Sequence, residues 1–102
     1  AVGGGANGGR ARWDGAAWTG ETFGVPGLSG VWMDADGAAT VVGMQGTIAE
    51  LAPASMVLQP QTSPTLLLLH AVFGFADGTR FAVGGSLAGP PPYVGVIVQR
   101  LP

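Results

Sequence analysis

One segment of this sequence occurs twice, with corresponding positions 41 residues apart. The corresponding pairs are Val31-Trp32 and Val72-Phe73, Asp36-Gly37 and Asp77-Gly78, and Val42-Gly43 and Val83-Gly84. A period of about 40 residues with strand-forming content is typical of β-sheet units that stack on one another. The repeat therefore predicts an all-β architecture built from successive, similar sheets.

The Asp-Gly pairs predict a hairpin turn in each unit, because glycine supplies the positive φ angle that a tight turn between strands needs. The 19 glycines and 8 prolines also argue against long helices, since both residues destabilise helix interiors. We expect strands at residues 28–33, 39–42, 47–51, 56–58, 66–75, 80–83 and 94–100.

The amino-terminal residues contain part of a further unit. Ala1-Val2-Gly3-Gly4 matches Ala82-Val83-Gly84-Gly85, and another Asp-Gly hairpin is expected between Trp13 and Trp18. The chain therefore divides into a partial unit with a linker at residues 1–26, a unit at 27–64 and a unit at 65–102. The last unit carries an inserted, proline-rich loop at residues 86–93.

Composition excludes several classes of function. The chain is 47% hydrophobic and only 10% charged, well below the roughly 25% of an average domain, so we expect neighbouring protein to cover much of its surface. Four arginines against six acidic residues give a net charge of -2, which offers no electrostatic footprint for nucleic acid. The absence of cysteine excludes disulfides and thiol nucleophiles.

No apolar run is long enough for a membrane-spanning helix, so we expect no membrane span and a soluble chain. The first residue is alanine, and no signal peptide is evident. This start is expected of a mature form after cleavage or of a piece of a longer chain.

These elements together resemble the tandem repeats of bacterial β-propellers. The motifs that carry the resemblance are Trp13-Asp14-Gly15 with Trp18, Val31-Trp32, Asp36-Gly37, and Val42-Gly43-Met44-Gln45-Gly46-Thr47-Ile48. The last unit departs from them, with Phe73 in place of the tryptophan and with its proline-rich insertion. The resemblance implies about two and a half four-stranded antiparallel blades, and it is compatible with a periplasmic or secreted location.

A propeller needs about four to eight blades, and two and a half would leave apolar sheet faces and strand edges uncovered. The chain is therefore not expected to act as a monomer. Either other copies of it or other polypeptide chains would complete the ring.

Several motifs suggest chemistry that their surroundings do not support. Asp34 and Asp36 resemble the start of a calcium loop, but the further ligands are missing, so a plain hairpin turn is favoured. The glycines at residues 3–8 satisfy a dinucleotide-binding pattern, but no helix follows them. Glu21 and Glu50 have no partner acid at matched positions, so the sequence gives no argument for a glycosidase pair, and no serine lies in a nucleophile motif. We expect no catalytic residues, no metal ligands and no cofactor.

Four residues are candidates for ligand binding: Trp18, Trp32, His70 and Tyr93. These two tryptophans, together with Trp13, could form a platform that stacks on carbohydrate, or they could pack between blades. His70 is the only histidine and lies in an apolar strand, where it is either a structural residue or, with that strand innermost, a channel-lining one. Tyr93 ends a P-P-x-Y pattern that either binds a WW-type domain or stiffens a loop.

The leading hypothesis is a non-enzymatic β-propeller portion that serves as an assembly or ligand-binding scaffold. One alternative is a fragment or subunit of a propeller enzyme whose site lies on other blades. The other is a lectin-like, carbohydrate-binding oligomer. The leading hypothesis, the scaffold, rests mainly on analogy at the level of the fold.

Overall fold

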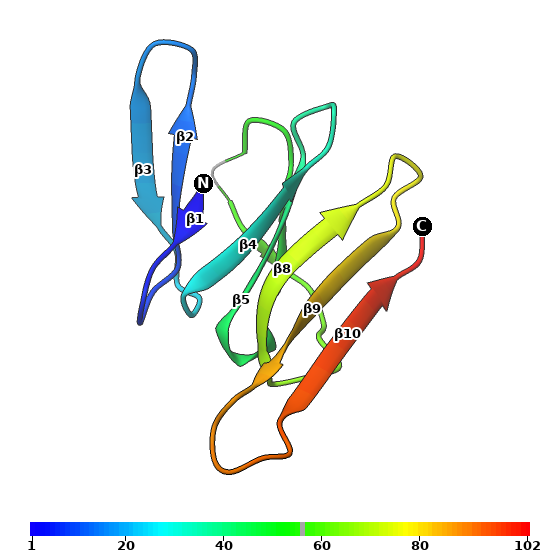
Figure 1. Cartoon of the computed structure of the whole chain (residues 1–102). Coiled ribbons are helices and arrows are strands. Elements are labelled where there is room, and N and C mark those ends of the chain that lie inside the picture. Colours follow the sequence, from blue (N-terminus) through cyan, green and yellow to red (C-terminus); the bar gives the residue numbers. More distant parts are fainter. Residues whose placement is uncertain (56) are drawn as a thin grey trace.

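Three antiparallel β-sheets follow one another along the chain in the computed structural model, which describes residues 1–55 and 57–102 (Figure 1). The first sheet contains β1 (Val2–Gly3), β2 (Gly9–Trp13) and β3 (Trp18–Thr22), in that order. The second contains β4 (Leu28–Met33), β5 (Ala39–Gly43), β6 (Ile48–Leu51) and β7 (Gln59–Pro60), with the short 3-10 turn η1 (Met44–Gly46) between β5 and β6. The third has the order β10-β9-β8, with β8 (Leu68–Gly74), β9 (Arg80–Ser86) and β10 (Val94–Arg100).

The expected all-β class is confirmed, and most of the expected strands are present. Strands β4 and β10 have the expected bounds. Strand β9 continues three residues further than expected, because Ser86 still pairs with Val94 of β10. An outer strand was expected at residues 56–58; Met56 lies outside the described residues, and the pairing with β6 is made instead by β7.

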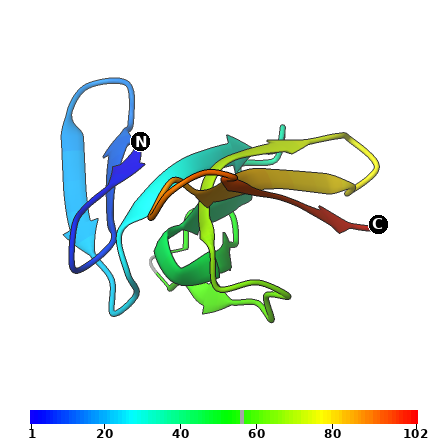
Figure 2. The same ribbon diagram turned by 60° about the horizontal axis from the view of Figure 1, so that its bottom comes forward.

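Among the residues that the structure describes, the sheets do not close into a ring, and only the second sheet has the expected four strands. Figures 1 and 2 show the first sheet on one side of the second sheet and well separated from the third.

The core consists of two clusters, one on each face of the second sheet. Val41 belongs to the cluster shared with the first sheet, and Val42 to the cluster shared with the third. Successive side chains of a strand point to opposite faces, so β5 contributes to both clusters and is buried along its whole length. Each cluster is completed by partly buried neighbours: Val2, Phe23, Val25 and Leu58 in the first, and Ile48, Val72, Val96 and Val98 in the second.

The pairs Val42-Gly43 and Val83-Gly84 mark two places where neighbouring strands approach closely. Gly43 lies opposite Leu28 of β4, and Gly84 lies opposite Leu69 of β8, each beside a β-bulge. A Cβ atom on Gly43 would lie 2.8 Å from Leu28 Cα, and one on Gly84 would lie 2.7 Å from Leu69 Cα. Both separations are far below van der Waals contact, so the bulged partner strand requires glycine at this position.

The three expected Asp-Gly hairpin turns are present. The carboxylates of Asp14, Asp36 and Asp77 accept hydrogen bonds from backbone N–H groups two or three residues ahead. These bonds, from Ala17 and Ala16 in one case and from Thr79 in the other, hold the pKa of Asp14 and of Asp77 below its ordinary value. Asp14 and Asp77 therefore act as turn acceptors in their charged form.

Candidate functional site

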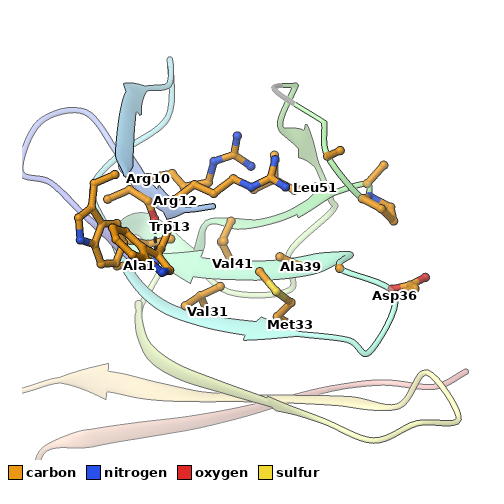
Figure 3. A pocket seen from close by; sticks show the side chains of 17 residues that line it. Ala1, Arg10, Arg12, Trp13, Val31, Met33, Asp36, Ala39, Val41 and Leu51 are labelled. Atoms are coloured by element: carbon orange, nitrogen blue, oxygen red, sulfur yellow. Dashed lines mark hydrogen bonds between the residues drawn. The ribbon is translucent and has the colours of Figure 1, made fainter. Parts of the chain in front are cut away.

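A groove of about 390 Å³ separates the first sheet from the second (Figure 3). Its residues come from β1, β2 and β3 on one side and from β4, β5 and β6 on the other, with the 52–54 loop at one end. The principal lining side chains are Val2, Arg10, Arg12, Trp13, Trp18, Val31, Met33, Asp36, Val41 and Leu51.

The second sheet forms an apolar floor to the groove. Val31 is 40% exposed and Met33 is 63% exposed, although both lie in a strand beside the core. Val41, the next floor residue inward, is fully buried. The floor is therefore an open continuation of the hydrophobic core between the sheets.

Two arginines of β2 extend along the opposite side of the groove toward Leu51 (Figure 3). Arg10 pairs with Glu21 of β3, with its Nε 2.6 Å from Glu21 Oε1, and donates a 3.1 Å bond to the carbonyl of Ser55. Arg12 is exposed, and no ion pair between described residues includes it. Arg12 is thus the groove cation that is available to a ligand.

Trp13 and Trp18 form an aromatic pair at the edge of the groove. They face each other across the β2–β3 hairpin, with ring centroids 5.5 Å apart and planes inclined by 49°. More than half of each side chain is exposed. Both were among the tryptophans expected to stack on carbohydrate or to pack between blades, and Trp18 was also one of the four ligand-binding candidates.

Trp32 lies at a different interface. Its ring contacts Phe73 of the third sheet with centroids 4.6 Å apart, and its Nε1 donates a 3.3 Å bond to Asp34. The packing there is close, since a Cβ atom on Gly74 would lie 2.6 Å from Trp32 Cδ1. Of the two roles considered for Trp32, packing between sheets is the one that these contacts describe.

His70 and Tyr93 lie apart from the groove. His70 occupies the β-bulge of β8 between Leu69 and Ala71 and is exposed. Tyr93 is an exposed residue at the end of the proline-rich loop before β10. Neither lines the groove, so Trp18 is the one candidate of the four that does.

A buried arginine links the second and third sheets, and sequence reasoning did not single it out. Arg80 is 6% exposed and forms an ion pair with Asp34. It also donates to Thr40 Oγ1 at 3.2 Å and to the carbonyls of Phe75 and Thr79 at 3.1 and 3.0 Å. Because all of these partners belong to the framework, the cluster holds the sheets together. Its only sequence signal is a charge in an otherwise apolar strand.

Within residues 1–55 and 57–102, no group of three or more His, Cys, Asp or Glu side chains could hold a metal ion. Nor does the described part contain a helix that is long and apolar enough to span a membrane. No family model matches the chain, and no curated protein or solved structure matches it either.

Proposed function

We propose that this chain is part of a β-propeller and acts as a non-enzymatic scaffold for assembly and ligand binding. The main support is the apolar outer face of the third sheet, formed by Phe73, Phe81, Val83 and Ile97. Phe81 is half-buried and the other three are exposed, Ile97 most of all, although the Phe73 ring also touches Trp32. Phe73 and Val83 occupy the repeat positions of Trp32 and Val42. In the second sheet those two positions pack against the next sheet.

The outer face is apolar and continuous. Phe73 pairs with Phe81, and Val83 pairs with Ile97, so the four side chains lie on adjacent strands of one face. The Phe75 ring extends the aromatic part, with its centroid 5.2 Å from that of Phe73 and 6.2 Å from that of Phe81. Large exposed apolar patches usually mark interaction surfaces, which supports stacking of a further sheet from another copy or another chain.

The charged residues of the described sheets favour a scaffold over an enzyme. Arg80 pairs with Asp34 and Arg100 pairs with Glu50, and both pairs join the second and third sheets. Arg10 pairs with Glu21 within the first sheet. Pairs that hold the framework leave few charged groups for acid-base chemistry.

Assembly is tested by replacing Ile97, which is 73% exposed, with glutamate. Burial of an isoleucine side chain contributes about 1.5–3 kcal/mol, so Ile97→Glu is expected to raise the dissociation constant for self-association by at least about tenfold. The measurement is native mass spectrometry with sedimentation velocity. The matched control is Leu66→Glu, because Leu66 is 85% exposed and lies outside the outer face. A folded wild-type monomer would overturn assembly from copies of this chain.

Carbohydrate binding is a second candidate, favoured by the exposed Trp13–Trp18 pair beside Arg12. Aromatic rings stack on the apolar faces of sugars, and a neighbouring guanidinium can donate to hydroxyl groups. We expect Trp18→Ala to lower glycan affinity by up to about tenfold, the scale of a lost aromatic contact. Glycan arrays followed by calorimetry measure this, with Leu68→Ile as the control. Equal binding by both variants would count against this candidate.

A further inference from the structure

The groove between the first and second sheets has a counterpart in the same molecule that is filled. The space between the second and third sheets keeps a void of only about 30 Å³, against about 390 Å³ for the groove. Two arginines of the third sheet, Arg80 and Arg100, line that void. In the second sheet their places are held by Ala39, 41 residues before Arg80, and by its strand partner Leu51. The groove is therefore open where two arginine side chains occupy its counterpart.

The two spaces also differ in charge. In the filled space, Arg100 pairs with Glu50 of β6. Arg12 holds the place of Glu50 in the first sheet, as the pairing of β2 with β1 and of β6 with β5 shows. It extends toward Leu51, an apolar residue at the place of Arg100 (Figure 3). An anion that would complete the ion pair is thus missing from the groove among the described residues.

The remaining groove side chains suit an aromatic body. The sulfur of Met33 on the floor is an adaptable contact for an aromatic ring, and the exposed rings of Trp13 and Trp18 can pack against a further ring at the edge of the groove. Asp36, the acidic residue of the lining, lies apart from the two arginines (Figure 3). A bound anion would therefore have its charged end at Arg12.

We propose that this groove binds a small aromatic carboxylate, with its ring on the apolar floor and its carboxylate on the Arg12 guanidinium. The inference rests on the proposed ligand-binding function and names the class of ligand. A guanidinium can donate two parallel hydrogen bonds to a carboxylate, and the ligand would supply here the charge that Glu50 supplies to Arg100 in the filled space. The groove volume falls within the range of small-molecule sites.

Naphthoate tests the proposal, with its uncharged amide, naphthamide, as the matched control ligand. We expect the full chain to bind naphthoate with a dissociation constant of about 0.1–1 mM. Naphthamide is expected to bind about tenfold more weakly, the scale of a charge-assisted hydrogen bond at an exposed site. Two-dimensional NMR measures both affinities. The methyl signal of Met33 is expected to shift, whereas that of Met44, which is exposed and does not line the groove, is not.

Two variants separate the charge from the floor. Arg12→Ala is expected to weaken naphthoate binding about tenfold and to leave naphthamide binding unchanged, so that the preference for the anion disappears. Met33→Glu is expected to abolish naphthoate binding, because it places a second carboxylate on the floor. Met33 is 63% exposed, so the new charge is not buried. Leu66→Glu is the control, since Leu66 is exposed and lies outside the groove.

The titrations are repeated on the Ile97→Glu chain, so that self-association does not cover the groove. No binding at about 10 mM naphthoate, equal affinity for naphthoate and naphthamide, or a preference for the anion that persists in Arg12→Ala would each overturn the carboxylate site. Self-association of the wild type without naphthoate binding would leave the assembly scaffold intact. Naphthoate binding by a chain that never self-associates would leave the carboxylate site intact and overturn assembly from copies of this chain alone.

Discussion

Replacement of Arg80 with alanine is expected to lower the free energy of unfolding by about 3 kcal/mol, the lower end of the cost of breaking a buried ion pair. The lower end applies because the side chain of the partner Asp34 is 30% exposed and water partly screens it. The variant removes the guanidinium that pairs with the Asp34 carboxylate and donates to the Thr40 hydroxyl and to two carbonyls. Urea unfolding monitored by tryptophan fluorescence gives the change.

Two further variants define the cause of that loss. Arg80→Lys keeps the charge but loses the forked guanidinium, so about half of the effect is expected. Arg12→Ala removes an exposed arginine that has no ion pair among the described residues, and it is expected to change stability by less than about 0.5 kcal/mol. A loss at Arg80 as small as that at Arg12 would show that the buried cluster does not hold the sheets together.

Gly84→Ala is expected to destabilise the chain by about 3 kcal/mol, at the upper end of the usual cost of overpacking. The added methyl group would meet the backbone of β8 at Leu68 and Leu69, and backbone atoms cannot move aside as a flexible side chain can. Thermal and urea unfolding measure the effect, and loss of the β8–β9 amide pairing in NMR spectra locates it.

Gly95→Ala is the matched control, because Gly95 is also a strand glycine of the third sheet. Its added Cβ atom would have its nearest neighbour at 3.9 Å, an ordinary contact, so a change within about 0.5 kcal/mol is expected. Equal effects at Gly84 and Gly95 would mean that general strand propensity, and not the close approach of the bulged strand, explains the repeated glycine.

Local chemistry was enough to predict the turns and most strands. An aspartate followed by glycine specifies its own turn through bonds to nearby N–H groups, so Asp14, Asp36 and Asp77 could be assigned without tertiary information. The end of β9 could not, because Ser86 is a strand residue only through its pairing with Val94, across the inserted loop.

The candidate site was predictable only in part. Trp18 could be identified as an aromatic residue in a hairpin motif, and it lines the groove. The roles of Met33 and Arg80 depend on which strands lie across from them, at separations of tens of residues, and residue type alone carries no such information. Asp34 was assigned to a turn, whereas its carboxylate also pairs with an arginine 46 positions away.

The neighbouring positions of Val41 and Val42 on β5 affect how the chain loses its structure. These two residues anchor opposite clusters through one short stretch of backbone, so disorder in β5 exposes both clusters to water at once. Fraying of the first or the third sheet exposes only one. We therefore expect the second sheet to unfold as one cooperative unit, whereas the first and the third sheet can each unfold locally. Additional sheets at either side would each contact only their nearest neighbour, as in a one-dimensional array of repeats.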